Sequence, residues 1–311
     1  MAARPAAVVL LNPAAGGNRG IARWQRAEGA VRRICEPRVV ETDLAGEWRF
    51  AVRQAIEDGT RLFIAAGGDG TVSALADELA RARGGIPLDE FTLGAIGLGS
   101  SNDFHKPCGR RIAGVPIRIE PSEQRRDVCV ARYTAPDGSA HTRCFVISAS
   151  VGVVAEANAF FNEGDAPERW LRRKWTGGAI LYAALHTIAT WRNLPVRLRS
   201  AGGTARTAVT NLSVSKTPFV SGMFRYDRSV APDDGFLAVH LCEGMSRKEA
   251  LRALVDLARG RFEGRSKRRH WNSWRLAVAA EGPLALELDG EVVQARRVTF
   301  GVLREQVKLC R

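Results

Sequence analysis

The chain contains 311 residues with a net charge of +13, and hydrophobic residues make up 45% of it. This composition excludes disordered and fibrous proteins and is sufficient for two domains with packed cores. The basic excess favours anionic partners, such as nucleotides, nucleic acids or anionic lipid surfaces. The apolar run at residues 6–11 is too short for a secretory signal, and the six cysteines lack metal-binding or CxxC spacing. We therefore expect a cytoplasmic protein with reduced thiols.

The first 120 residues alternate strand and helix patterns. Apolar runs predict strands at 6–12, 38–42, 61–66 and 92–99, and helical periodicity predicts helices at 21–34, 46–59 and 71–83. This alternation indicates a parallel sheet with helices on its faces. In such a sheet the ligand-binding loops lie at the carboxyl ends of the strands.

After about residue 125 the pattern changes to one rich in strands. Strands are predicted at 127–134, 141–152, 195–201, 207–217, 235–243, 274–281, 284–293 and 296–303, with helical insertions near 167–191 and 246–260. We therefore expect an α/β domain at residues 1–125 and an antiparallel β-sandwich domain at residues 126–299.

The pentapeptide Gly67-Gly68-Asp69-Gly70-Thr71 lies between a predicted buried strand and a helix. Its glycines carry no Cβ, so backbone N–H groups can approach phosphate oxygens, and the helix N-terminus adds a positive dipole end. Thr71 either caps the helix or offers its hydroxyl to a phosphate. Asp69 is compatible with a phosphate if it holds Mg²⁺ or accepts a proton from an attacking hydroxyl. A tight turn with a capping aspartate is the alternative.

A second loop follows the first predicted strand. Asn12 ends that strand, Gly16 and Gly17 open the backbone, and Arg19 can provide a cation. The Gly-Lys-Ser/Thr ending of a Walker A loop is missing, so an ordinary strand-to-helix connection remains the alternative.

A third loop follows the strand at 92–99. Ser100, Ser101 and Asn102 offer hydroxyl and amide groups to a phosphate or ribose. Asp103 can accept a substrate hydroxyl or bind water around a metal ion. We expect the three loops to converge on one crevice, because they follow strands of one parallel sheet.

The segment Asp289-Gly290-Glu291 lies between two strand patterns near the end of the chain. Asp-Gly is a preferred pair for a type I′ hairpin turn, which is one interpretation. The other is a carboxylate aimed at the nucleotide cleft as a general base or a magnesium ligand.

Residues 169–193 suggest contact with an anionic bilayer, because basic residues stand beside interfacial aromatic ones. These residues are Arg169, Arg172, Arg173 and Lys174 with Trp170, Trp175, Tyr182 and Trp191. An amphipathic helix packed on the second domain is the alternative. A second basic run at 259–271 can contact phosphate head groups or form a solvated face. No nucleic-acid module is recognisable, so we expect no nucleic-acid partner.

Four motifs, Asn12–Gly17, Gly67–Thr71, Ser100–Phe104 and Asp289–Glu291, resemble those of the diacylglycerol kinase catalytic-domain family in order and approximate separation. That family includes bacterial diacylglycerol and related lipid kinases, sphingosine kinases and ceramide kinases. The resemblance spans nearly the whole chain. The Gly-Gly-Asp-Gly-Thr motif is shared with NAD kinases, whereas its combination with Asn-Asp-Phe and a late Asp-Gly-Glu is more specific.

The resemblance implies a nucleotide-binding α/β domain like that of phosphofructokinase and NAD kinase, and a β-sandwich domain that takes the lipid. It also implies an active cleft between the domains, and a C-terminal tail of about residues 300–311 that returns to the first domain. The expected activity is an ATP- and Mg²⁺-dependent phosphorylation of a hydroxyl of diacylglycerol or a related lipid. Such an enzyme would be cytoplasmic and peripheral at the inner membrane face.

The resemblance further assigns roles to individual residues. It places the ATP phosphates at Gly67–Thr71 and Mg²⁺ at Asp69 and neighbouring carboxylates, among them Asp127. Asp289 is the candidate base, with Glu291 assisting the metal or nucleotide. In sphingosine-kinase-like members the base is instead the aspartate that matches Asp69.

Residues 231–239 resemble an element that binds a structural Mg²⁺ in some bacterial members, which implies Asp234 and the Phe236 carbonyl as ligands. The chain also departs from the family. Many relatives carry lysine where Gly17 stands, and Arg19 is the candidate replacement.

Two alternatives to a lipid kinase remain open at this point. One is an NAD-kinase-like enzyme with a soluble substrate, and the other is a non-catalytic anionic-lipid-binding protein on a decayed kinase scaffold. The sequence also leaves a homodimer open.

Overall fold

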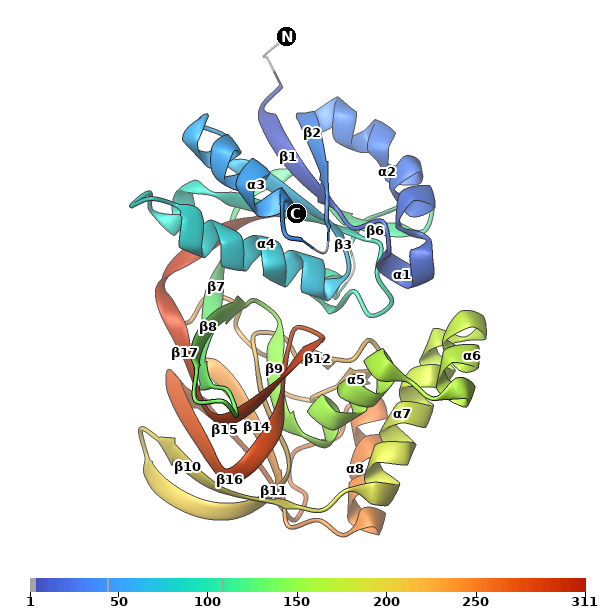
Figure 1. Ribbon diagram of the computed structural model, residues 1–311, viewed down its shortest axis with the longest axis vertical. Helices are drawn as coiled ribbons and strands as arrows, with labels where there is room; N and C mark the ends of the chain where they lie inside the picture. Colours follow the sequence, from blue (N-terminus) through green and yellow to red (C-terminus); the bar gives the residue numbers. More distant parts are fainter. Residues whose placement is uncertain (1–3, 44, 108) are drawn as a thin grey trace. The chain divides into compact units, whose positions relative to one another are not determined.

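The structure, a computed structural model, describes residues 4–43, 45–107 and 109–311. The chain forms two units, shown in Figure 1. Unit 1 comprises Met1–Val128 and Arg304–Arg311, and unit 2 comprises Cys129–Leu303. Because β7 and β17 each cross a boundary, the two units are joined by continuous strands rather than by loops.

Unit 1 is built on β1 (Ala6–Leu11), β2 (Glu36–Glu41), β3 (Leu62–Gly67) and β4 (Thr92–Gly97). β1 pairs in parallel with β2 and β3, and β3 pairs in parallel with β4. The end of β17 (Glu291–Cys310) adds a parallel pair with β4 at Lys308 and Thr92. β3 is buried along its whole length, as expected for a strand covered on both faces.

Helices cover both faces of this sheet. Successive residues of a strand point to opposite sides, and strands such as β3 are apolar at successive positions, so both faces need to be covered. The helices are α2 (Gly20–Ile34), α3 (Trp48–Glu57) and α4 (Asp69–Ala82). Val9, Ile64 and Ile96 pack in one cluster with Trp24 and Val31 of α2. On the other side α3 contacts β1 and α4 contacts β3 and β4, as Figure 1 shows. The remaining short elements are α1 (Ala15–Asn18), η1 (Leu88–Glu90), η2 (Asp103–His105), β5 (Arg111–Ile112) and β6 (Val115–Arg118).

A buried carboxylate joins α3 to α4. Glu78 of α4 is fully buried, and its carboxylate oxygens lie 2.7 Å from Arg49 Nη1 and 2.6 Å from Arg53 Nε of α3. A buried carboxylate that loses its partners is strongly destabilising, so this pairing holds α4 in place. The position of α4 matters because its first residue is Asp69.

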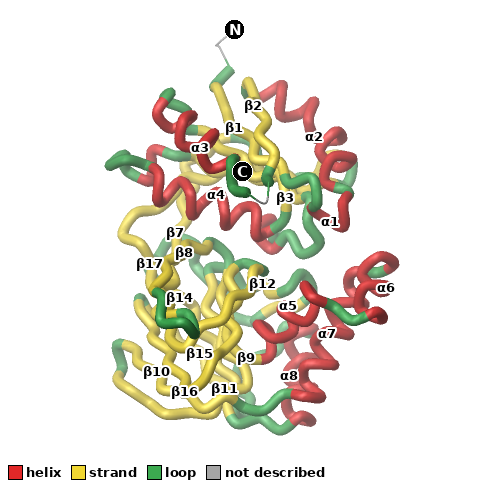
Figure 2. The backbone as a smooth tube through the Cα atoms, viewed as in Figure 1, coloured by secondary structure: helices red, strands yellow, loops and turns green. Residues whose placement is uncertain are grey.

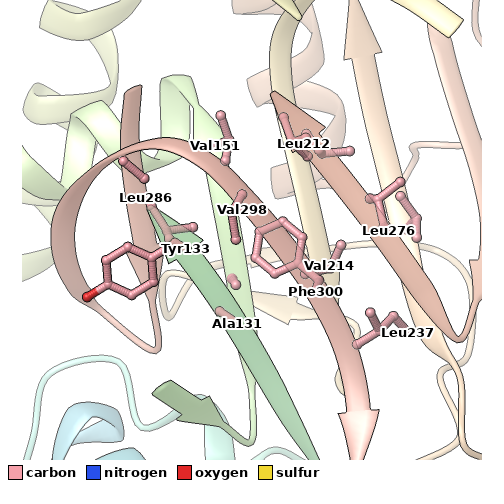
Figure 3. Close-up of a cluster of buried hydrophobic side chains, with 14 of the residues drawn as sticks. Ala131, Tyr133, Val151, Leu212, Val214, Leu237, Leu276, Leu286, Val298 and Phe300 are labelled. Atoms are coloured by element: carbon pink, nitrogen blue, oxygen red, sulfur yellow. The ribbon is translucent and has the colours of Figure 1, made fainter. Parts of the chain in front are cut away.

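Unit 2 consists mainly of antiparallel strands. They are β7 (Pro121–Thr134), β8 (Ala140–Phe145), β9 (Ser148–Gly152), β10 (Leu194–Ser200), β11 (Gly203–Ser215), β12 (Phe219–Val220), β13 (Phe224–Arg225), β14 (Leu237–Glu243), β15 (Arg268–Ser273) and β16 (Arg275–Leu288), with most of β17. β9 and β10 each pair with both β11 and β16, at opposite ends of those two strands. Apolar side chains of eight strands meet in one core, part of which is shown in Figure 3, and it includes Tyr133, Val151, Leu212 and Phe300.

Four helices gather on one side of the strands of unit 2, as Figure 2 shows. They are α5 (Val153–Glu163), α6 (Ala166–Lys174), α7 (Thr176–Thr190) and α8 (Arg247–Ala258). The Asp165 side chain caps α6, and Ser246 and Glu249 form a capping box at the start of α8. In the part of the chain that the structure describes, no helix has the length and apolarity to cross a membrane.

The strand expected at 141–152 is interrupted, which corrects the sequence prediction. The N–H groups of Val146 and Ile147 donate to the Asp289 side chain at 2.8 and 3.1 Å, so they are not available to a neighbouring strand. The strand expected at 284–293 is likewise broken by the turn at Asp289-Gly290.

Helical content in unit 2 also differs from the prediction. Residues 153–163 form α5, a helix that the sequence pattern did not predict. The helix expected at 167–191 is two helices separated at Trp175. The basic run at 259–271 includes the start of β15, an edge strand whose partner is β14.

Candidate functional site

Three loops leave the carboxyl ends of β1, β3 and β4, which are neighbours in the sheet of unit 1. The Asn12 N–H donates to the Ala66 carbonyl at 2.8 Å, joining the loop after β1 to the end of β3. The N–H groups of Leu98 and Gly99 donate to the Gly67 carbonyl at 2.8 and 3.2 Å, joining the loop after β4 to the same strand. The structure therefore brings together the three glycine-containing loops that the sequence singled out.

The loops approach each other closely because glycine occupies their contact points. A Cβ on Gly67 would lie 2.2 Å from Thr71 Oγ1, and a Cβ on Gly99 would lie 2.5 Å from the Gly68 Cα. Both distances are shorter than real contacts, so alanine at Gly99 would push two backbones apart. Gly16 adopts φ +62° in the loop after β1, a conformation that favours glycine.

Asp69 connects the loop after β3 to the loop after β4. Its Oδ2 accepts the Asp103 N–H at 2.9 Å, and its Oδ1 accepts the Phe104 N–H at 3.1 Å. Asp69 is also the first residue of α4, where the helix dipole stabilises a negative charge. Because hydrogen bonds to a charged acceptor are stronger than neutral ones, Asp69 anchors the third loop.

Thr71 does not cap α4, which corrects one of the two roles that the sequence allowed. Gly68 is the N-cap residue, and the Thr71 N–H donates to the Gly68 carbonyl at 3.0 Å. The Thr71 hydroxyl accepts a hydrogen bond from Asn12 Nδ2 at 3.3 Å. Asn12 Oδ1 in turn accepts one from the Ala14 N–H at 3.0 Å. These contacts join the loop after β1 to α4. The reason for the difference is that α4 begins at Asp69 rather than Thr71.

Arg23 is a site residue that the sequence analysis missed. It lies in the first half of α2, and its Nη1 donates to the carbonyls of Leu98 and Gly99 at 2.6 and 3.1 Å. Arg23 lies one helical turn after the first loop. Because arginines on helices are ordinarily surface residues, nothing in the sequence marked Arg23 as a site residue. Arg19, the cation that the sequence proposed, is exposed, as is Gly17.

A pocket of about 340 Å³ lies beside the third loop. Its lining includes the polar residues Ser100, Ser101 and Asn102 and the cations Arg23, Arg26, Lys106 and Arg111. A concave site that combines hydroxyl groups with several cations favours an anionic ligand.

The two buried aspartates of unit 1 that the sequence singled out already have partners. Asp103 is buried, and its Oδ1 lies 2.6 Å from Lys106 Nζ. Asp127 of β7 is also buried, and its Oδ1 accepts Gln306 Nε2 at 2.8 Å. Within the described residues, no three histidine, cysteine, aspartate or glutamate side chains form a group that could hold a metal ion.

His105 lines the same pocket and is buried. Burial, together with the nearby cations of Arg118 and Arg111, lowers the pKa of His105 to about 3. The ring is therefore neutral at neutral pH.

In unit 2, Asp289 and Gly290 form the turn between β16 and β17. Both residues have positive φ, +47° and +94°, as a type I′ turn requires. The Asp289 carboxylate is buried and accepts three backbone N–H groups, those of Val146, Ile147 and Ser148, at 2.7 to 3.1 Å. Asp289 therefore holds the connection between β8 and β9.

The two glutamates beside this turn differ in exposure. Glu287 is buried and accepts the Ser150 hydroxyl at 2.7 Å and the Gly290 N–H at 2.5 Å. The Glu291 side chain is 49% exposed and pairs with Arg143. Glu291 is thus the solvent-accessible carboxylate of the Asp-Gly-Glu segment.

The two oxygens expected to hold a structural Mg²⁺ contact a lysine instead. Lys216 Nζ lies 2.7 Å from Asp234 Oδ1 and 2.7 Å from the Phe236 carbonyl oxygen. These two oxygens therefore bind an ammonium group, and with Lys216 in this position they do not fit a metal ion at the same place.

Two family models match the chain. One, described as the diacylglycerol kinase catalytic domain, matches residues 6–121. The other, described as the YegS C-terminal NAD kinase beta sandwich-like domain, matches residues 148–311.

Relatives and solved structures agree with these matches. A Pseudomonas aeruginosa (strain UCBPP-PA14) protein named "Probable lipid kinase YegS-like" is 25% identical over 296 residues, 95% of this chain and 90% of the relative. A Pseudomonas putida (strain KT2440) protein of the same name is 25% identical over 256 residues, 82% and 79% of the two chains. A solved structure described as a diacylglycerol kinase from Bacillus anthracis has a TM-score of 0.63 at 16% identity, covering 98% of this chain and 96% of that one. This last likeness shows the fold.

Replacing Asp69 by asparagine tests the anchoring contact. An asparagine side chain has one acceptor oxygen, so one of the two N–H groups loses its partner. We expect amide hydrogen exchange at Asp103 and Phe104 to become about 10- to 100-fold faster, measured by NMR or mass spectrometry. The control is Asp77→Asn on the same helix, where exchange at these amides should stay unchanged. Unchanged exchange in Asp69→Asn would contradict the anchoring role.

The buried neutral His105 predicts a pH dependence of stability. Its folded pKa of about 3 lies below its ordinary value of 6.5, so protonation favours the unfolded state. The contribution of the neutral His105 ring to the free energy of unfolding is complete above about pH 6.5 and is lost as the pH falls toward 3. From pH 7 to pH 5 we expect wild type to lose about 2 kcal/mol more unfolding free energy than His105→Gln, measured by urea denaturation. The exposed control His141→Gln should follow wild type, and equal losses in wild type and His105→Gln would exclude this origin.

Proposed function

Because the chain belongs to the diacylglycerol kinase catalytic-domain family, with a YegS-type C-terminal domain, we propose that it phosphorylates a hydroxyl of diacylglycerol or a related lipid, with ATP and Mg²⁺. The observation that carries the proposal is the junction of three strand-end loops in unit 1, held by Asp69. Phosphoryl transfer needs alignment and charge neutralisation more than covalent help, and this junction offers both.

The phosphate-binding part of the proposal rests on unit 1. Gly68 and Gly70 are partly exposed beside the N-terminus of α4, where backbone N–H groups and the helix dipole favour an anion. The neighbouring pocket adds the guanidinium groups of Arg23 and Arg26. We propose that these cations take the neutralising role of the lysine that relatives carry at the position of Gly17.

The magnesium part rests on Asp69. Mg²⁺ is usually held by one or two carboxylates together with substrate phosphates and water, so a larger acidic cluster is not required. Asp69 would hold the ion directly or through water, and the bound ion would neutralise charge on the phosphate oxygens. Asp103 and Asp127 lie in the same unit but bind Lys106 and Gln306.

We propose Glu291, rather than Asp289, as the group that accepts the hydroxyl proton. Asp289 already accepts three backbone N–H groups and is buried, so protonating it would cost those hydrogen bonds. Glu291 is half-exposed and has room to receive a substrate hydroxyl, with Arg143 holding its carboxylate. This choice differs from the resemblance, which favoured Asp289.

The lipid part of the proposal rests on the helices of unit 2. A small apolar cavity of about 60 Å³ lies among α5, α7 and α8, lined by residues such as Val153, Phe161, Ile180, Leu254 and Leu257. Apolar lining of this kind suits the end of a hydrocarbon chain. We propose that the acyl part of the substrate enters here.

Membrane contact is proposed for α6 and α7. Trp170 and Trp175 are exposed, and Leu181 and Leu185 lie one turn apart on the exposed face of α7. Exposed aromatic and aliphatic side chains next to basic residues suit an anionic bilayer surface. The side chains of Arg169, Arg172, Arg173 and Lys174 lie outside the described part of the structure.

Phosphoryl transfer to lipid is the direct test. With labelled ATP, Mg²⁺ and vesicles containing a bacterial lipid extract, we expect a phosphorylated lipid that mass spectrometry identifies, and no transfer to NAD. Gly99→Ala, which forces the loops apart, should lower the rate on the order of 10²-fold. In the control Gly282→Ala the added Cβ has no atom within 4 Å, so this variant should transfer phosphate at the wild-type rate. Transfer to NAD alone, or ATP binding without turnover on any lipid, would exclude the proposal.

The choice between the two carboxylates predicts different defects. Glu291→Gln should lower kcat on the order of 10²- to 10⁴-fold with an unchanged melting temperature. Asp289→Asn should lower the unfolding free energy by about 1–3 kcal/mol, because backbone N–H groups lose a partner. Glu281→Gln, an exposed glutamate of the same unit, is the control for both measurements. A Glu291→Gln enzyme with the wild-type rate would remove Glu291 as the base.

A further inference from the structure

We propose that the Lys216 ammonium is a built-in cation that replaces the structural metal ion at Asp234 and Phe236, so that unit 2 needs no divalent ion there. Lys216 directly follows β11, and its side chain is fully buried. Lysine is almost never fully buried unless its charge is paired, so its partners define a specific cation site.

The partners of Lys216 are the two oxygens that were expected to be metal ligands. Nζ lies 2.7 Å from Asp234 Oδ1 and 2.7 Å from the Phe236 carbonyl oxygen. Asp234 Oδ1 also accepts the Phe236 N–H at 3.0 Å, which bends residues 234–236 around the ammonium. An ammonium group donates hydrogen bonds and accepts none, so carboxylate and carbonyl oxygens are suitable partners.

Charge and distance both argue against a metal ion at the same place. One ammonium neutralises one carboxylate, whereas a divalent ion beside Lys216 would place three positive charges near the same oxygens. Mg²⁺ also binds oxygen at about 2.0–2.1 Å, which requires the ammonium to leave. Removing it would break the two charge-assisted hydrogen bonds of the buried ammonium and leave its charge without partners at that site.

The backbone of Lys216 is also linked by hydrogen bonds to the Asp289 turn. The Lys216 N–H donates to the Ile147 carbonyl at 2.8 Å, and the Ile147 N–H donates to Asp289 Oδ1 at 3.1 Å. Residue 147 therefore links the lysine backbone to the buried carboxylate beside Glu291. Because this link uses the Lys216 backbone, Lys216→Ala retains it, and any effect of that substitution on activity rests on the proposed function. The stability and metal-binding measurements below do not.

The experiment measures melting temperature of the full chain without nucleotide, in EDTA and in millimolar Mg²⁺, Mn²⁺ or Ca²⁺. Lys216→Ala should melt roughly 5–10 °C below wild type in EDTA, because the Asp234 carboxylate and the Phe236 carbonyl lose the ammonium that they bind. Divalent ions should restore part of that loss, and isothermal titration should detect one more metal site than in wild type. The double variant Lys216→Ala/Asp234→Asn should lose the restoration. Lys248→Ala, an exposed lysine of α8, is the matched control.

Wild type provides a test that does not depend on the folding of Lys216→Ala. Any metal-induced shift in wild-type melting temperature should be the same in Asp234→Asn, because no metal binds at Asp234. A shift in wild type that disappears in Asp234→Asn would overturn the proposal, as would a folded Lys216→Ala with unchanged melting and no added metal site. If lipid transfer fails in wild type but the rescue by metal succeeds, the proposed function fails and this inference stands.

Discussion

The site of unit 1 depends on one partly buried interaction, the acceptance of two backbone N–H groups by the Asp69 carboxylate. The loops after β3 and β4 come from neighbouring parallel strands, so their starting points are close, but their tips carry polar backbone groups that need partners. Asp69 satisfies two of those groups with a charged acceptor. The absence of Cβ atoms at Gly67 and Gly99 permits the approach that these bonds require.

Unit 2 uses the same device around Asp289. Its carboxylate accepts three backbone N–H groups of residues 146–148, and the type I′ turn presents it to them because both turn residues have positive φ. Aspartates that motif reasoning associates with chemistry are thus also the residues that order the loops. In unit 2, Glu291 follows the anchored turn two residues after Asp289 and is the accessible carboxylate there.

Side-chain cations bind other acidic side chains and backbone carbonyls of the two units. Arg23 binds the carbonyls of Leu98 and Gly99, Lys106 pairs with Asp103, and Lys216 binds Asp234 and the Phe236 carbonyl. A side-chain cation is present at every metal concentration, and its charge matches a single carboxylate. A chain rich in basic residues can therefore satisfy acidic loops without recruiting ions, and still hold open cationic sites for anionic ligands, such as the pocket beside the third loop.

The sequence by itself determined β1–β4 and α2–α4 of unit 1 to within a few residues, because segments such as Ala6–Leu11 and Gly20–Ile34 carry the period of the structure they form. It did not predict the short elements of that unit, such as β6. It also determined which loops hold glycine and acid, and the Asp289-Gly290 turn, since these are local properties. Tertiary structure decided what those acids bind. Val146 lies 143 residues from Asp289 and Lys216 lies 18 residues from Asp234, so the interrupted strand and the lysine at the expected metal site depend on contacts that no local pattern encodes. Arg23 became part of the site for the same reason, because only packing of α2 places its guanidinium on the carbonyls of Leu98 and Gly99.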